Sequence, residues 1–198
     1  MQGSIVIRIR GVSAAHAPMH PFQESLLLAI SPASRGFGYV FMKGPAGLID
    51  WGVKDIRQDK NVTCLEKLDA LITFYGPEFV VFENPSETPS RRSLRIRHLL
   101  QGVERLADRK GVKGNPIGRR DMRDFFSRHG AGTKHRRAEI LASQFPELAS
   151  SLPPPRKIWM SEDPRISIFE SLALALAFWY ADKPPSSIER PLSGPSGP

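Results

Sequence analysis

Cysteine is nearly absent from this sequence, which has Cys64 alone among its 198 residues. One cysteine excludes an internal disulfide framework and leaves no cysteine pair of the kind that holds structural zinc. The chain must therefore rely on a hydrophobic core, for which 40% apolar residues suffice at this length. We expect one folded domain in a reducing cytoplasm.

Long apolar runs are also lacking. A membrane helix needs about 20 consecutive apolar residues, whereas the longest candidate, residues 166–180, is interrupted by Glu170. Residues 1–12 alternate arginine with isoleucine and contain no apolar stretch typical of a secretory signal. We therefore expect no membrane segment and a cytoplasmic location.

Positive charge, in contrast, is present in excess and is unevenly placed. The net charge is +8, and residues 91–137 alone hold fifteen Lys or Arg against four acids, a local excess of +11. Such a basic block favours binding to a polyanion, because neutralising phosphates releases counterions. The alternative is a solvated surface whose charges stabilise helices.

Three strands are predicted near the beginning of the chain, at residues 26–30, 38–43 and 48–53. Residues 26–30 form a continuous apolar run, which is typical of a buried strand. Residues 44–47, Gly-Pro-Ala-Gly, supply a tight turn between the second and third strands. The pattern predicts an antiparallel meander.

Helical spacing then alternates with further strands. Leu65, Leu68 and Ile72 mark a helix that Gly76 and Pro77 end. The later elements that we expect are a strand at 78–83, a helix from Ser90 to Lys110, a strand at 112–117, helices at 119–127 and 134–144, and a last helix from Asp163 to Ala181. The predicted organisation is an appendage at 1–21, a domain at 22–182 and a disordered tail at 183–198.

This order of elements predicts an α/β, ribonuclease H-like fold: a five-stranded mixed sheet, with three antiparallel strands and then parallel strands, flanked by helices. Right-handed connections between parallel strands place the helices on the sheet faces. Ligands of such sheets bind at the carboxyl ends of the central strands. Ser31 and Glu83 are expected at that edge, each at the end of a strand.

Acidic residues near that edge are candidates for metal chemistry, because two-metal phosphodiester hydrolysis needs carboxylates from several elements. Glu83 ends a strand, and Glu170 lies on the apolar last helix, where an unpaired carboxylate is costly. An ion pair with a neighbouring arginine is the alternative for Glu170, and capping of the following loop is the alternative for Glu83. Asp163 lies two turns before Glu170, or it caps the helix.

Four segments follow one another along the chain: Ser31-Pro32-Ala33-Ser34-Arg35-Gly36-Phe37-Gly38-Tyr39, Glu83 before a long helix, Gly130-Ala131-Gly132-Thr133-Lys134, and Glu170-Ser171-Leu172-Ala173. In this order they resemble the RuvC-like Holliday-junction resolvases of the ribonuclease H superfamily, over residues 26–180. The family pattern has an aspartate where this chain has Ser31, and an additional acid where it has Ser167. A hydroxyl is a poor Mg²⁺ ligand beside a carboxylate, so we expect weakened metal binding.

The resemblance implies a role for each candidate residue. The catalytic candidates are Ser31, which contributes at most a hydroxyl or a water-mediated ligand, Glu83, Lys134 and Glu170, and the candidate ligands of Mg²⁺ or Mn²⁺ are Glu83, Asp163 and Glu170. The candidate nucleic-acid contacts are Arg91, Arg92, Arg95, Arg119, Arg120, Lys134, Arg136 and Arg137. Branched or duplex DNA is the implied partner, and the family also implies a homodimer.

The expected function is therefore nucleic-acid binding of the RuvC type, with Mg²⁺-dependent endonuclease cleavage weakened or lost. One alternative is a non-catalytic DNA-binding or scaffold protein, and salt-dependent DNA binding would argue against a scaffold. A less favoured alternative is a phosphotransferase, because sugar kinases and actin-like ATPases begin with a related strand-turn-strand. Those proteins need a second domain that 198 residues do not supply.

Overall fold

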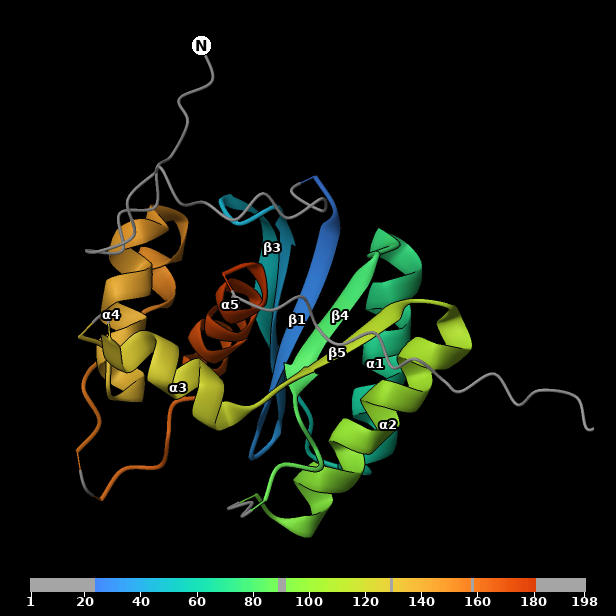
Figure 1. Cartoon of the computed structure of the whole chain (residues 1–198). Coiled ribbons are helices and arrows are strands. Elements are labelled where there is room, and N and C mark those ends of the chain that lie inside the picture. Colours follow the sequence, from blue (N-terminus) through green and yellow to red (C-terminus); the bar gives the residue numbers. More distant parts are fainter. Residues whose placement is uncertain (1–23, 89–91, 129, 158, 181–198) are drawn as a thin grey trace, which may run out of the picture.

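A five-stranded mixed sheet with helices on both faces forms the centre of the protein (Figure 1). The computed structural model describes residues 24–88, 92–128, 130–157 and 159–180. The strand order is β3-β2-β1-β4-β5, which confirms the predicted ribonuclease H-like fold. The predicted appendage at 1–21 and tail at 183–198 lie outside the described residues. Within the described ranges, none of the helices is long and apolar enough to cross a bilayer.

The first three strands form the predicted meander, but they are longer than the sequence pattern indicated. They are β1 (Leu26–Ala33), β2 (Gly36–Lys43) and β3 (Gly47–Asp55). Ser31 pairs with Gly38 inside the β1–β2 ladder, and the hairpin closes only after Ala33. The prediction that Ser31 ends its strand was therefore wrong by two residues, because the proline and the small residues after it continue the extended backbone.

The two parallel strands continue the sheet on the other side of β1. They are β4 (Phe79–Glu83), which pairs with β1, and β5 (Lys113–Ile117), which pairs with β4. All five residues of β4 are buried, as expected for a strand covered on both faces. The carboxyl ends of β1, β4 and β5 consequently lie along one edge of the sheet.

Helices α1 (Lys60–Tyr75) and α2 (Leu94–Lys110) cover one face of the sheet. Each ends at a glycine with a left-handed backbone, Gly76 and Gly111. The side chain of Ser93 caps α2 by accepting a hydrogen bond from the backbone N–H of Ile96. The cap thus lies three residues after Ser90, from which the helix was expected to run, and Ser90 lies outside the described residues.

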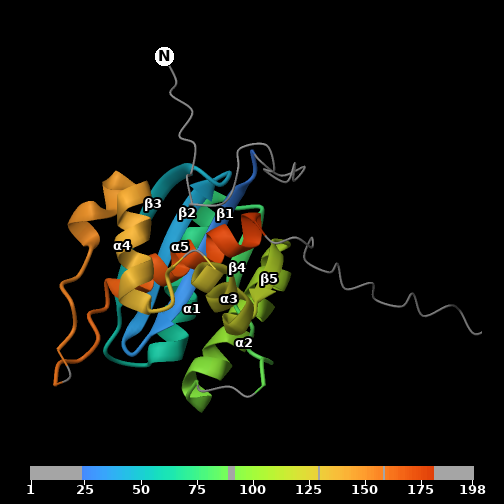
Figure 2. The ribbon, with the colours of Figure 1, turned by 60° about the vertical axis from the view of Figure 1, so that its left-hand side comes forward.

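The other face carries a buried helix, α5 (Ile166–Trp179), and an outer layer of helices (Figures 1 and 2). The outer layer consists of α3 (Arg119–Arg128), α4 (Lys134–Gln144) and a short 3-10 helix, η2 (Pro146–Ser151). Every residue of α5 is buried, because this helix lies between the sheet and the outer layer. Its position explains why its sequence is apolar on all sides.

The start of α5 differs from the prediction. The expected helix began at Asp163 with Pro164 in its first turn, whereas the regular helix begins at Ile166. The intervening residues form a tighter turn, in which the N–H groups of Ile166 and Ser167 donate to the carbonyls of Asp163 and Pro164. The Asp163 side chain accepts a hydrogen bond from the backbone N–H of Arg165.

Close contact between β2 and α5 fixes this buried helix on the sheet. The hydroxyl of Ser171 donates to the carbonyl of Gly38 over 2.9 Å. A Cβ atom added to Gly38 would lie 2.6 Å from the carbonyl oxygen of Ser167, which no side chain can occupy. Gly38 is therefore required for the approach of the helix to the strand.

We expect Gly38→Ala to destabilise the fold by about 3 kcal/mol, because overpacking forces the backbones of β2 and α5 apart. Chemical denaturation with circular dichroism measures this change. Gly132→Ala is the matched control, since an added Cβ there meets no atom within 4 Å, and its effect should stay within about 0.5 kcal/mol. Equal stabilities of the two variants would contradict the close-contact interpretation.

Candidate functional site

Ser31 and Glu83 lie side by side on adjacent strands and face α5. In the parallel ladder, Leu27 pairs with Phe79 and Ala29 with Val81. All four residues belong to the core cluster on the α5 face. Ser31 lies two residues after Ala29, and Glu83 lies two residues after Val81, so both side chains point to the same face as these core residues. Both are buried, with exposed fractions of 2% and 1%.

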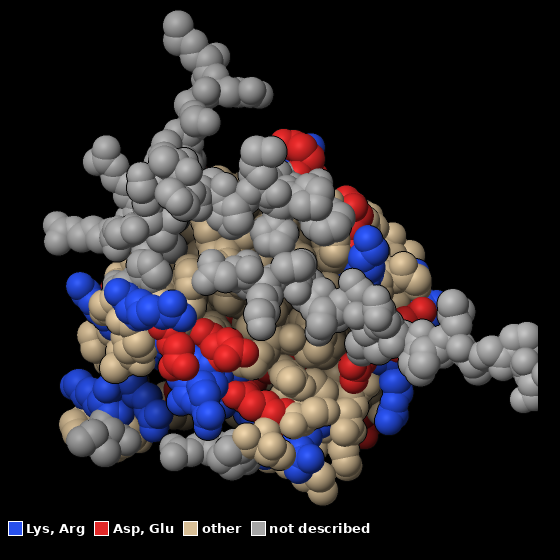
Figure 3. Space-filling view, viewed as in Figure 1, with Lys and Arg blue, Asp and Glu red and all other residues tan. Residues whose placement is uncertain are grey.

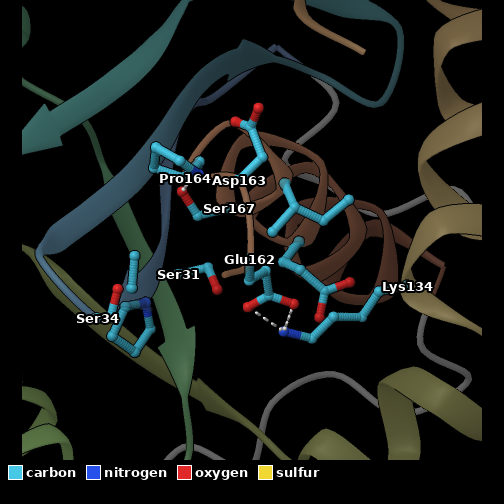
Figure 4. Close-up of a pocket in the computed structure, with 11 residues that line it drawn as sticks. Ser31, Ser34, Lys134, Glu162, Asp163, Pro164 and Ser167 are labelled. Carbon is cyan, nitrogen blue, oxygen red and sulfur yellow. Dashed lines mark hydrogen bonds and ion pairs between the residues drawn. The ribbon is translucent and has the colours of Figure 1, made fainter. Parts of the chain in front are cut away.

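Glu170 reaches the same region from α5. It is 2% exposed and, together with Ser31, lines a small hollow at the carboxyl end of β1 (Figure 4). The other polar side chains that line this hollow are Ser34, Lys134, Glu162, Asp163 and Ser167. The fold thus brings Ser31, Lys134, Asp163 and Glu170 around one opening, whereas Glu83 is not part of its lining.

Glu83 is held by two arginines. The Nε of Arg92 donates to Oε2 of Glu83 over 2.8 Å, and a second guanidinium nitrogen of Arg92 donates to Oε1. The Nε of Arg119 lies 3.5 Å from Oε2 of the same carboxylate. The carboxylate of Glu83 is thus paired with Arg92, which precedes α2, and with Arg119 at the start of α3.

The pKa of Arg92 is affected by several acidic groups that lie near its guanidinium group. Burial acts to lower this pKa, yet the pKa is raised, chiefly by the hydrogen bond from Arg92 to Glu83 and by the charge of that carboxylate. The charges of Glu170 and Glu162 act in the same direction. One guanidinium group thus interacts with carboxylates from β4, from α5 and from the loop before α5.

Glu170 forms a buried ion pair with Arg137 of α4. The Nε and Nη2 atoms of Arg137 donate to Oε1 of Glu170 over 3.2 and 2.7 Å. Arg137 is only 2% exposed. The alternative interpretation of Glu170, an ion pair with an arginine, is confirmed. Arg137, which was predicted to contact nucleic acid, is buried on the side of α4 that packs against α5.

Two further ion pairs surround the opening. Lys134 Nζ donates to both carboxylate oxygens of Glu162, over 2.8 and 3.0 Å (Figure 4). Arg165 donates to both oxygens of Asp163, and this side-chain hydrogen bond is the main reason that the pKa of Asp163 is lowered. Lys134 and Asp163 are thus paired with other residues of the chain.

The residues at this edge do not fit a divalent metal ion. Four carboxylates, those of Glu83, Glu162, Asp163 and Glu170, have five basic partners: Arg92, Arg119, Lys134, Arg137 and Arg165. Mg²⁺ and Mn²⁺ favour carboxylates whose charge is not already compensated. Among the described residues, no three His, Cys, Asp or Glu side chains come close enough together to hold a metal. The predicted ligands Glu83, Asp163 and Glu170 are thus each paired with arginine, although among the described residues the buried Oε2 of Glu170 has no hydrogen-bond partner.

The remaining predicted nucleic-acid contacts divide into two groups. Arg95 binds the backbone carbonyls of Ala33 and Ser34, over 3.1 and 3.3 Å, and so holds the β1–β2 hairpin against α2. Arg92 and Arg119 are occupied by Glu83 as described above. Arg120 and Arg136 are exposed, and Arg91 lies outside the described residues.

The sequence analysis missed Glu87 and gave Arg137 a different role. Glu87 caps α3, because its carboxylate accepts hydrogen bonds from the backbone N–H groups of Arg119 and Arg120 over 2.8 and 3.0 Å. Arg137 was assigned to the surface, although it lies four residues before the buried Leu141 and next to the buried Ala138. That helical spacing was the available signal that Arg137 faces the core.

The fold is similar to that of solved RuvC structures. A Thermus thermophilus RuvC structure matches with a TM-score of 0.54 and 18% sequence identity, over 79% of this chain and 95% of that chain. T. thermophilus RuvC in complex with a Holliday junction substrate matches with a TM-score of 0.55 and 16% identity, over 78% of this chain and 92% of that chain. No protein-family model and no curated protein sequence matches this chain significantly.

Proposed function

We propose that this protein binds DNA, branched or duplex, at the edge of the sheet where β1, β4 and β5 end, and that it does so without metal-dependent cleavage as its main activity. The similarity of its fold to RuvC, including the complex with a Holliday junction substrate, supports DNA as the ligand. The ion pairs of Glu83 and Glu170 with arginines support binding over cleavage.

The main support for this proposal is that two helices begin at this edge with exposed arginines. Helix α2 follows the end of β4 and has Arg97 near its start, and α3 follows the end of β5 and has Arg120 near its start. Both arginines are exposed. Figure 3 shows basic and acidic side chains gathered in the lower left part of one face of the protein. Exposed arginines of this kind suit phosphate contacts, which position DNA without reading its sequence.

We expect the double variant Arg97→Glu, Arg120→Glu to weaken binding of four-way junction and duplex DNA equally, because it removes phosphate contacts. Fluorescence anisotropy at about 50 and 200 mM salt measures the affinity and its salt dependence, and the salt slope should fall by about two. All binding reactions contain EDTA, and parallel reactions with Mg²⁺ or Mn²⁺ on labelled DNA test for cleavage.

The matched control is Arg105→Glu, Arg109→Glu. These two arginines are also exposed, but they lie in the second half of α2, towards the opposite edge of the sheet. The same charge change should there reduce affinity much less. Equal losses in the two variants would place the DNA elsewhere, and efficient metal-dependent cleavage by the wild type would contradict binding as the main activity.

Trp159 is a second candidate contact, of a different kind. Its side chain is 80% exposed, and Nζ of Lys157 lies 5.6 Å from the centre of its ring. It lies on the segment between η2 and α5, which also supplies Glu162 and Asp163 to the opening. An exposed aromatic ring beside a cation suits stacking on an unpaired base, such as those at a branch point.

We expect Trp159→Ala to weaken binding of junction or single-stranded DNA about tenfold, since stacking contributes about 1–3 kcal/mol per base. Phe74→Ala is the matched control, because Phe74 is also 80% exposed but lies at the end of α1, away from this edge. DNA should also quench the tryptophan fluorescence of the wild type more than that of Trp159→Phe. Unchanged affinity in Trp159→Ala would remove this residue from the interface.

A further inference from the structure

We propose that Arg137 serves as a permanent internal cation, which compensates the buried acidic site in place of a divalent metal ion. The structure assigns this role through the contact between Arg137 and Glu170, at the place where the predicted fold family suggested metal ligands. The inference concerns how the site is stabilised, and it goes beyond the proposed DNA binding.

The position of Glu170 requires a cation. Every residue of α5 is buried and Glu170 is 2% exposed, so its carboxylate is largely removed from solvent, and an unpaired charge there is strongly unfavourable. Arg137 meets this need with two N–H groups aimed at Oε1 of the carboxylate, whereas the buried Oε2 of Glu170 accepts no hydrogen bond from the described residues. Because an arginine side chain stays protonated at any physiological pH, Arg137 supplies this positive charge without a metal ion.

A divalent ion at the unpartnered Oε2 of Glu170 would lie close to the guanidinium group of Arg137, which binds Oε1. It would bind carboxylate oxygen at about 2.0–2.6 Å, and so would bring two positive charges next to Arg137 and next to Arg92, whose guanidinium group also senses Glu170. The side chain of Arg137 is only 2% exposed. Displacing it would leave a buried guanidinium group without a partner, which is strongly destabilising.

The neutral side chain of Ser31 is consistent with this pairing of each carboxylate with an arginine. Glu83 is compensated by Arg92 and Arg119, and Glu170 by Arg137, so each buried carboxylate at this edge has its own arginine. Ser31 faces the same side of the sheet as Glu83 and lines the hollow with Glu170. A carboxylate at position 31 would add a third buried negative charge. A neutral residue at position 31 and an arginine at position 137 therefore belong to one arrangement.

Thermal unfolding of the full chain tests this inference. We expect the melting temperature of the wild type to be the same in EDTA, in millimolar Mg²⁺ and in millimolar Mn²⁺. Arg137→Met should lower the melting temperature by about 10 °C, because it leaves Glu170 buried and unpaired. Arg136→Met is the matched control: Arg136 is the neighbouring residue, is exposed and pairs with Glu139, and its loss should change the melting temperature by at most about 2 °C.

The double variant Arg137→Met, Glu170→Met separates charge compensation from simple loss of packing. It removes both charges, so it should recover most of the stability that Arg137→Met loses. This variant also keeps the test valid if Arg137→Met alone fails to fold. A double variant as unstable as Arg137→Met would overturn the inference.

A metal titration of Ser31→Asp tests whether the site takes up Mg²⁺ once a carboxylate is added beside Glu83 and Glu170. With Arg137 in place, the added carboxylate should lower the melting temperature, and Mg²⁺ should not restore it. Saturable stabilisation by Mg²⁺, in Ser31→Asp or in the wild type, would overturn the inference. DNA affinity enters none of these measurements, so failure of the proposed DNA binding would be recognised separately.

Discussion

The ion pair between Arg137 and Glu170 is the interaction on which the outer half of this fold depends. It joins α4 to α5 inside the layer that covers one face of the sheet. Without a cation at this position, the buried carboxylate of α5 would oppose the packing of a helix whose every residue is enclosed. The same contact also affects the carboxyl edge of the sheet, because it neutralises Glu170, the acid of α5 that lies near Ser31.

Charge compensation links the site to the surface around it. Arg92 and Arg137 direct guanidinium N–H groups at carboxylates of this edge, and Arg119 lies within ion-pair distance of Glu83, so these side chains are less available to phosphate. Nucleic-acid contacts are then left to arginines on the exposed sides of α2 and α3 and to the segment that carries Trp159. The site consequently divides into a buried part that stabilises the fold and an exposed part that suits DNA.

Much of the fold could be predicted from the sequence, because buried strands and amphipathic helices have distinct periodicities. The apolar run before Ser31 correctly predicted the start of β1, and the glycine after Tyr75 correctly predicted the end of α1. Ser31 itself was placed at a strand end because proline follows it, although an extended backbone accommodates proline there. The pairing of Glu170 with Arg137 could be anticipated only as one of two alternatives, because the partner comes from another helix, 33 residues away.

The central claim is that this edge of the sheet is compensated by arginines and does not take up divalent metal. A crystal structure of the wild type grown with Mn²⁺ tests it most directly, because anomalous scattering locates manganese without ambiguity. The account predicts no manganese at Glu83 or Glu170 and an intact contact between Arg137 and Glu170. A manganese ion coordinated by either carboxylate, with Arg137 or Arg92 displaced, would contradict it.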